Sequence, residues 1–246
     1  NFFKICADNP NEWYSVCGER QISRGDFLCA VNEIISVIKR KFGQNKFIPI
    51  KCDKTAFTPC YFFACHLLGK AYVPIPADVP LSREQTILSL LDIDQSLDES
   101  ETSKELGGYD KEDLDDALRD LQEHVACLTP YDPDAIAYIL FTSGSTGVPK
   151  GVQISFENVK SFIEWTTSEY SISSCDVFLN QVPFTFDLSV LDLYSSFING
   201  SKIVCLNKES SLDFSLINKN IIDYEVTCIY STPSFLKLLS HSSEFK

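Results

Sequence analysis

Short apolar runs alternate with longer segments of helical periodicity along most of this 246-residue sequence. The runs that we interpret as strands are 47–50, 71–75, 135–141, 177–180, 202–205 and 226–229. The segments that we interpret as helices are 55–68, 82–91, 111–124, 156–170, 188–197, 212–222 and a last one that begins at Pro233. Because parallel strands need crossover connections, this alternation predicts an α/β fold. We expect mostly parallel, doubly wound sheets with helices on both faces.

The N-terminal segment carries turn and capping signals. Residues 13–16 and 21–23 flank a Gly-Glu turn, which predicts a short hairpin. Ser23 precedes a run of helical periodicity and Gly43 follows it, so we expect a capped helix that ends near residue 42. Further along, Ser82 and Gln85 have the spacing of a capping box, which would open the helix that starts at 82.

The charge of the chain restricts its partners. The formal net charge is −13, and an acidic protein is poorly suited to the phosphate backbone of nucleic acid. Much of the acidity lies in residues 92–123, which we interpret as a solvated surface excursion with one exposed helix. We find no apolar run long enough to span a bilayer and no secretory signal, so a cytoplasmic location is expected.

Cysteine is frequent, and methionine is absent even at the first position. The ten cysteines are Cys6, Cys17, Cys29, Cys52, Cys60, Cys65, Cys127, Cys175, Cys205 and Cys228. None forms a C-x-x-C pair, so buried free thiols in a reducing compartment are expected, and no metal site is predicted in this chain. Without an initiating methionine, the chain is expected to be processed, trimmed or fragmentary.

The most informative stretch begins at Tyr138, where an apolar strand runs into a loop rich in glycine and hydroxyl groups. Glycines let backbone N–H groups approach an anion, and consecutive N–H groups form an anion-binding nest. The hydroxyls of Thr142, Ser143, Ser145 and Thr146 and the charge of Lys150 complete a loop suited to polyphosphate. Its spacing matches neither a Walker A loop, nor a nucleophile elbow, nor a dinucleotide fingerprint. A flexible Gly/Ser loop is the alternative, which the preceding strand and the following Pro-Lys-Gly disfavour.

Residues 142–151, Thr-Ser-Gly-Ser-Thr-Gly-Val-Pro-Lys-Gly, resemble the signature loop of the adenylate-forming superfamily. Residues 68–75 resemble an earlier motif of that superfamily, although Pro76 stands where it usually has Asp. The resemblance implies the fold of the large N-terminal domain and an ATP-dependent, AMP-forming acid–thiol ligase that uses Mg²⁺ and no bound prosthetic group. It assigns the phosphates of ATP to Thr142, Ser143, Gly144, Ser145, Thr146, Gly147 and Lys150. Among these it gives Thr146 and Lys150 a catalytic role.

Asp187 lies between an aromatic strand end and the start of an apolar helix. A carboxylate in this position can act as a helix N-cap, which is the structural alternative. In amino-acid-activating members of the superfamily, the matching Asp pairs with the α-ammonium of the substrate. An ammonium held in a pocket needs such a partner, because an unpaired charge there is costly. Asp187 therefore favours an amino acid substrate.

Four stretches together resemble the D-alanine-activating ligases of teichoic acid D-alanylation. They are 151–155, 162–165, 184–190 and 231–235. The resemblance implies activation of D-alanine as D-alanyl-AMP and transfer to the phosphopantetheine thiol of a carrier protein. A peptide synthetase domain for another amino acid, an acyl-CoA synthetase and a non-catalytic nucleotide-binding relic remain alternatives.

Several elements of a complete adenylate-forming site are not found in the sequence. The motifs that contact adenine and ribose are missing, as are the C-terminal catalytic lysine and the small mobile domain. The histidines His66, His124 and His241 lie in no motif and are assigned no catalytic role. Residues 1–246 are therefore expected to be a truncated N-terminal adenylation domain that is inactive by itself.

Overall fold

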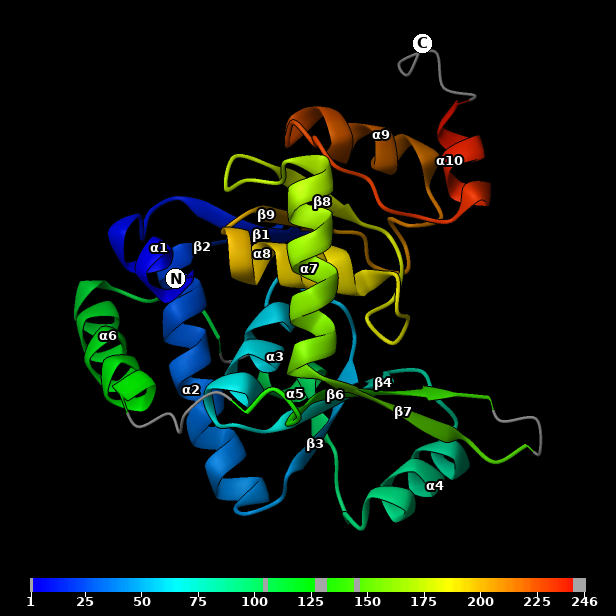
Figure 1. Cartoon of the computed structure of the whole chain (residues 1–246). Helices are drawn as coiled ribbons and strands as arrows, with labels where there is room; N and C mark the ends of the chain where they lie inside the picture. The colour runs from blue at the N-terminus through cyan, green and yellow to red at the C-terminus, as the bar shows by residue number, and fades with distance from the viewer. Residues whose placement is uncertain (1, 104–105, 127–131, 144–146, 241–246) are drawn as a thin grey trace.

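The computed structural model describes residues 2–103, 106–126, 132–143 and 147–240, apart from the side chain of residue 126 (Figure 1). The strands are β1 (Trp13–Cys17), β2 (Arg20–Ser23), β3 (Phe47–Cys52), β4 (Ala71–Pro76), β5 (Leu97–Asp98), β6 (Ile136–Thr142), β7 (Lys150–Ser155), β8 (Val177–Asn180) and β9 (Lys202–Cys205). The helices are α1 (Phe2–Asp8), α2 (Arg24–Phe42), α3 (Thr58–Leu67), α4 (Leu81–Leu91), α5 (Glu99–Thr102), α6 (Lys111–Ala126), α7 (Phe156–Tyr170), α8 (Ser189–Asn199), α9 (Phe214–Asp223) and α10 (Pro233–Ser240).

The strands form two sheets, and most neighbouring strands are parallel. The five-stranded sheet has the order β5-β3-β4-β6-β7, in which only the β6–β7 pair is antiparallel. The four-stranded sheet has the order β2-β1-β9-β8, in which only the β1–β2 hairpin is antiparallel. Figure 1 shows α3 and α8 between the two sheets, and α4 and α9 outside them. The predicted fold class of mostly parallel sheets with helices on both faces is confirmed.

Alternating side chains cover both faces of the four-stranded sheet. On one face, Phe178 and Ile203 join the large core that also contains α2, α3 and α8. On the other face, Leu179 and Val204 pack with Ile217 of α9 and other apolar residues of α9 and α10. Successive residues of a strand point to opposite faces, so buried strands of this kind are apolar throughout. This explains why they appear in the sequence as uninterrupted apolar runs.

The capped helix predicted after residue 23 is present as α2. Ser23 is the N-cap: its Oγ accepts from the backbone N–H of Asp26 at 3.0 Å, and the Asp26 carboxylate accepts from the backbone N–H of Ser23 at 2.8 Å. Gly43 follows the helix with φ of 47°, a conformation that glycine adopts without the cost of a Cβ. The capping-box partner is Asp26, three residues after the cap.

Replacing Ser23 with alanine is expected to lower the free energy of unfolding by about 1 kcal/mol, because the backbone N–H of Asp26 in the first turn of α2 loses its acceptor. Ser36 provides a matched control, since it is exposed in the middle of the same helix. Ser36→Ala should leave stability unchanged or raise it slightly, because alanine is the better helix former. Urea unfolding of both variants measures the difference, and equal midpoints for the two would show that the cap contributes nothing.

Two local predictions are wrong. Ser82 does not cap a helix: α4 begins at Leu81 with Pro80 in the N-cap position, and no side chain caps it. Residues 226–229 do not form a strand, because only Cys228 pairs with Phe178 of β8, in an isolated parallel bridge. The strand β7 and the short elements α1, β5 and α5 were not predicted.

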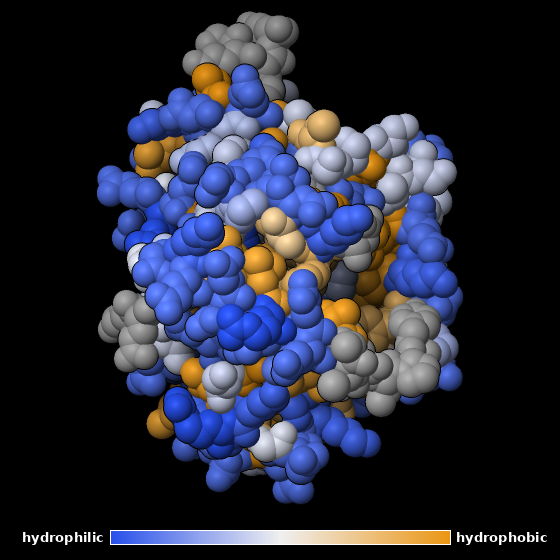
Figure 2. All heavy atoms as spheres, turned by 90° about the vertical axis from the view of Figure 1, so that its left-hand side faces the viewer, coloured by the Kyte–Doolittle hydropathy of each residue, from blue (hydrophilic) through white to orange (hydrophobic). Residues whose placement is uncertain are grey.

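The acidic excursion contains a surface helix, as expected. The helix α6 lies beside α2, where Asn32 Nδ2 donates to Asp120 Oδ2 at 3.1 Å. Figure 2 views this side of the molecule and shows a mostly hydrophilic surface. The carboxylates of residues 92–123 within the described ranges therefore lie largely on a solvated face, with buried Glu99 as an exception.

Glu99 is fully buried and takes part in the fold. Its carboxylate accepts from the hydroxyl of Thr55 at 2.6 Å, from Thr58 at 2.5 Å and from the backbone N–H of Asp53 at 2.9 Å. Burial raises the pKa of Glu99, and these donors oppose the rise. The carboxylate ties α5 to the segment between β3 and α3, a long-range role that its neighbours in sequence do not indicate.

The cysteines of the described ranges are free thiols, and most are buried. Cys52 and Cys228 are half-buried, and Cys175 is exposed. Within the same ranges, no cluster of His, Cys, Asp and Glu could hold a metal ion. No described helix is both long enough and apolar enough to span a membrane.

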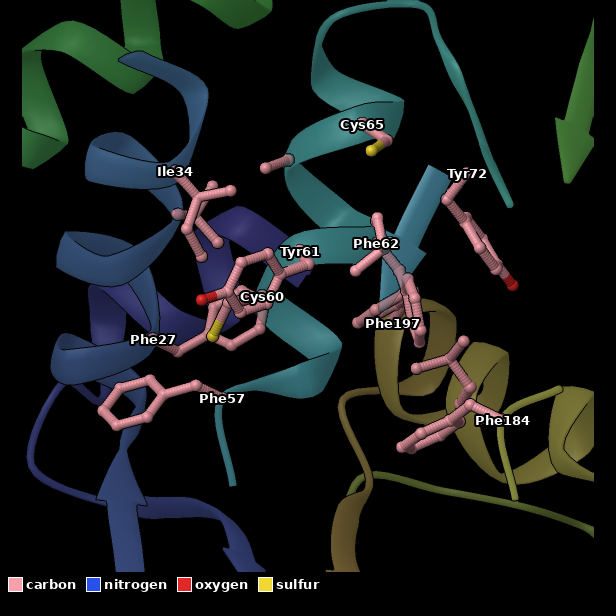
Figure 3. Packing of buried hydrophobic residues seen from close by; sticks show 14 of the residues in the cluster. Phe27, Ile34, Phe57, Cys60, Tyr61, Phe62, Cys65, Tyr72, Phe184 and Phe197 are labelled. Carbon is pink, nitrogen blue, oxygen red and sulfur yellow. The ribbon is translucent and has the colours of Figure 1, made fainter. Parts of the chain in front are cut away.

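The core between the sheets is rich in aromatic rings. Figure 3 shows α3 between α2 and α8, with Tyr61 on the side of Phe27 and Phe62 on the side of Phe184. Phe62 stacks on Tyr72 of β4 with ring centroids 4.2 Å apart. Since α3 is covered from both sides, its sequence is apolar nearly all round, as expected for a central helix.

Candidate functional site

The β6–β7 hairpin carries the predicted phosphate loop. Strands β3, β4 and β6 are parallel, so their carboxyl ends lie at the same edge of the sheet, and β6 ends there at Thr142. Thr142 pairs with Lys150, the first residue of β7, and its hydroxyl lies 3.4 Å from the Lys150 carbonyl oxygen. Ligands of open α/β sheets bind beyond the carboxyl ends of the strands. The hairpin extends outward at this edge (Figure 1).

The β7 side of the loop is shaped by two glycines. Gly147 has φ of 80°, which favours glycine, and a Cβ at Gly151 would lie 2.9 Å from Cγ2 of Ile139. Thr142, Ser143, Gly147 and Lys150 are exposed, so their polar groups can meet a ligand. Gly144, Ser145 and Thr146 lie outside the described residues. The sequence pattern therefore combines two requirements: glycines that shape the turn, and exposed donors beside it.

Asp187 lines a pocket of about 280 Å³. The pocket walls come from the β6–β7 hairpin, the helix α7, the start of α8 and the segment before α10. The lining residues are Tyr138, Ile154, Asn158, Val159, Phe162, Asp187, Leu188, Val190 and Tyr230. Tyr138 and Ile154 are paired across the hairpin, so the strand that enters the loop also forms the pocket wall.

The helix-cap alternative for Asp187 is wrong. The N-cap of α8 is Leu188, and no side chain accepts a hydrogen bond there. The backbone carbonyl of Asp187 accepts from Val190 N–H at 3.1 Å, while its side chain is exposed at the pocket. The carboxylate is therefore available for a ligand instead of serving the helix.

Asp187 acts electrostatically on Tyr138. Burial, followed by the negative charge of Asp187, raises the pKa of Tyr138 to about 12. Tyr138 lies four residues before Thr142 on β6, a distance of roughly 13 Å at about 3.3 Å per residue. The two residues share a face of the strand, because side chains alternate. The structure thus connects the Asp187 pocket and the start of the loop through one strand.

Some pocket residues were not singled out from the sequence. Tyr230 lies one residue before the 231–235 stretch, and Asn158 lies on α7 before the 162–165 stretch. Of that stretch, Phe162 lines the pocket, whereas Trp165 is exposed and packs against Phe162 and Tyr170. The only sequence signal for Tyr230 and Asn158 was that each lies close to one of these stretches. That they meet in one pocket depends on the tertiary fold.

Of the described histidines, neither His66 nor His124 lines the Asp187 pocket. His66 Nε2 lies 2.8 Å from the Tyr194 hydroxyl, and burial lowers the pKa of His66 to about 3, so its ring is neutral. His124 lies on α6, where its Nε2 is 2.6 Å from Lys39 Nζ. His241 is outside the described residues.

Comparison with known families and proteins gives consistent matches. Residues 2–246 match the family described as AMP-binding enzyme. The D-alanine–D-alanyl carrier protein ligase of Bacillus licheniformis is 35% identical over 187 residues, which are 72% of this chain and 36% of that protein. The enzyme of the same name from Listeria monocytogenes is 36% identical over 179 residues, covering 69% of this chain and 34% of its own length. The chain thus spans about a third of these relatives.

Solved structures share the fold. The nonribosomal peptide synthetase FmoA3 superposes with a TM-score of 0.78 at 21% identity, over 100% of this chain and 26% of that one. The O-succinylbenzoate coenzyme A synthetase MenE of Bacillus subtilis, in complex with AMP, gives a TM-score of 0.75 at 20% identity, over 100% of this chain and 65% of that one. At these identities the likeness concerns the architecture alone.

Proposed function

The chain belongs to the AMP-binding enzyme family, and from this premise we propose that it forms part of a ligase that activates D-alanine as D-alanyl-AMP. The D-alanyl group then passes to the phosphopantetheine thiol of a carrier protein, for D-alanylation of teichoic acid. The observation that carries the proposal is the exposed Asp187 carboxylate in a small pocket whose wall is the strand leading into the phosphate loop. The names of the relatives that are 31–37% identical support D-alanine and a carrier protein.

In the proposed mechanism, Asp187 pairs with the α-ammonium of D-alanine and holds the amino acid in the pocket. The loop residues Thr142, Ser143, Gly144, Ser145, Thr146, Gly147 and Lys150 hold the β- and γ-phosphates of ATP. The D-alanine carboxylate attacks the α-phosphorus, the bond from this phosphorus to the bridging oxygen breaks, and pyrophosphate leaves. Lys150 and Thr146 stabilise the charge that develops on the departing group, and positioning provides much of the rate gain.

Magnesium is expected with ATP, because Mg²⁺ usually binds phosphate oxygens with one or two carboxylates. The described residues form no acidic or histidine cluster that would hold the ion without ATP.

The size and charge of the pocket favour a small amino acid. Its volume of about 280 Å³ lies near the lower end of ligand pockets, and Asp187 is the acidic group that lines it. An acyl-CoA synthetase activates acids without an ammonium and would not need this carboxylate. A peptide synthetase domain for another amino acid is the second candidate, because it would use the same pairing.

A pyrophosphate-exchange panel distinguishes these candidates. It uses the longest natural reading frame that contains this chain, with D-alanine, L-alanine, glycine, D-serine and acetate as substrates. D-alanine should exceed every other acid by at least about tenfold in kcat/KM, a difference of about 1.4 kcal/mol. Preference for another amino acid would favour a peptide synthetase domain. Preference for acetate would exclude both the D-alanine ligase and the peptide synthetase domain.

The same panel tests whether residues 1–246 suffice. We propose that they form a partial N-terminal adenylation domain and show little or no exchange alone, because motifs that contact adenine and ribose are not found in them. Robust D-alanine-dependent exchange by the 246-residue chain would refute this part of the proposal without affecting the choice of substrate.

A further inference from the structure

Lys54 makes three hydrogen bonds to one short backbone segment. It follows β3 with a positive φ of 57°, and its ammonium donates to the carbonyl oxygens of Asn180 at 2.9 Å, Gln181 at 3.1 Å and Val182 at 2.8 Å. An ammonium has three donors, so the charged form satisfies all three carbonyls at once. A positive φ is uncommon outside glycine, which indicates that the surrounding contacts hold this backbone in place.

These hydrogen bonds join the two sheets. Lys54 follows a strand of the five-stranded sheet, whereas residues 180–182 lead out of β8 in the four-stranded sheet. The junction lies at a cavity of about 730 Å³, lined by residues that follow the carboxyl ends of strands from both sheets. Lys54 therefore fixes the relative position of the sheets at the edge where the proposed phosphate loop begins.

The segment held by Lys54 is also fixed through its side chains. Asn180 Nδ2 donates to Oδ2 of the fully buried Asp192 on α8 at 2.9 Å. Gln181 Oε1 accepts from the Ser231 hydroxyl at 3.1 Å, and Ser231 follows the pocket residue Tyr230. Residues 180–182 are thus connected to the helix that starts after Asp187 and to the segment that carries Tyr230.

The charges around Lys54 agree with this arrangement. Burial lowers the pKa of Lys54 to about 8, and the nearby Cys205, Cys17 and Asp192 oppose the decrease. Burial raises the pKa of Asp192 to about 8, and its hydrogen bond from Asn180 and the charge of Lys54 oppose the rise. The three carbonyl acceptors further favour the ammonium, because a neutral amine would leave one of them without a donor.

We propose that Lys54 is a positioning residue for amino acid activation, which fixes residues 180–182 and thereby places Asp187 and Tyr230 around the substrate. This inference rests on the proposed function, since it assigns Lys54 to the same pocket. In this proposal Lys54 contacts neither ATP nor the amino acid. Its effect is geometric, and a displacement of about 1 Å in a site of this kind can cost about a hundredfold in rate.

Lys70 provides a matched control within the same sheet. Its ammonium also donates to backbone carbonyls, of Gly43 at 2.8 Å and Asn45 at 2.6 Å. It precedes β4, whereas Lys54 follows the parallel strand β3, so the two lysines lie at opposite edges. Lys54→Met and Lys70→Met therefore remove the same chemistry, one near the proposed site and one away from it.

The experiment measures D-alanine-dependent pyrophosphate exchange in the longest natural reading frame, with the melting temperature recorded for each variant. Lys54→Met should raise KM for D-alanine by at least about tenfold and change KM for ATP by less than about twofold. Lys54→Arg keeps charge and donors and should recover part of the loss. Lys70→Met should leave both KM values unchanged, whatever its melting temperature.

Ser231→Ala is a milder variant that removes only the hydroxyl bonded to Gln181. It should raise KM for D-alanine about two- to fivefold, so it tests the inference even if Lys54→Met does not fold. If Lys54→Met folds and its KM for D-alanine is unchanged, the inference is overturned. If Lys54→Met does not fold, an unchanged KM for D-alanine in Ser231→Ala overturns it instead. If the wild type prefers another amino acid, the proposed substrate is wrong, and the same comparison with that amino acid still decides the role of Lys54.

Discussion

Replacing Asp187 with alanine is expected to reduce D-alanine-dependent pyrophosphate exchange by about 10²–10⁴-fold, because removing one partner of a desolvated ion pair costs about 3–5 kcal/mol. The Asp187 carboxylate is exposed at the pocket, and in the proposed function the bound amino acid covers it and pairs its ammonium with it. The main effect should be a higher KM for D-alanine, with KM for ATP nearly unchanged. Steady-state exchange at varied D-alanine and varied ATP separates the two.

Asp213 is the matched control for Asp187, because both residues precede a helix. Asp213 caps α9, accepting from the backbone N–H groups of Ser215 at 2.9 Å and Leu216 at 3.2 Å, whereas Asp187 caps nothing. Asp213→Ala should lower stability by about 1 kcal/mol and leave exchange intact. Asp187→Ala should instead reduce exchange and leave stability unchanged. Asp187→Ala with wild-type exchange and reduced stability would identify this residue as structural.

Lys150→Met is expected to reduce exchange by about a hundredfold, in the range found when one preorganised donor is removed from a transition state. Lys150 is the exposed first residue of β7, directly after the loop that we propose holds the phosphates. Loss of its charge should lower kcat and raise KM for ATP, with a smaller effect on KM for D-alanine. This pattern is opposite to the one expected for Asp187→Ala.

Lys219 on α9 is the control for Lys150, as another exposed lysine on an element that does not line the Asp187 pocket. Lys219→Met changes the net charge of the protein by the same amount and should leave exchange within about twofold, because long-range effects of surface charges are screened at physiological salt. Equal losses in the two variants would show that the effect of Lys150 comes from overall charge and not from its place beside the loop.

The fold could be predicted where local signals and tertiary structure agree. Ser23 and Gly43 bound α2 as expected, since caps act over a few residues. At α4 the capping pattern of Ser82 was misleading, because Pro80 fixes the entry of the chain and the helix starts earlier. β7 was missed because Lys150 and Gly151 belong to the loop motif, and the strand exists through its pairing with β6. Such pairing over distance leaves little trace in local sequence.

The candidate site likewise contains residues that the local sequence indicates and residues that only the tertiary fold brings together. The hydroxyls, glycines and lysine of the loop are contiguous, so the motif itself indicated them. Asp187 could be singled out only by resemblance, because a carboxylate before a helix is ordinarily a cap. Tyr230 and Lys54 could not be found from the sequence, since their roles depend on the approach of segments more than forty positions apart. The environment of a pocket follows from the fold, not from any single stretch.

A crystal structure of the longest natural reading frame that contains this chain, with a nonhydrolysable ATP analogue and D-alanine, tests the central claim most directly. We expect the β- and γ-phosphates at the backbone N–H groups of residues 143–147, and the D-alanine nitrogen about 3 Å from an Asp187 carboxylate oxygen. A nucleotide bound to another surface, or an amino acid whose ammonium points away from Asp187, would contradict the account.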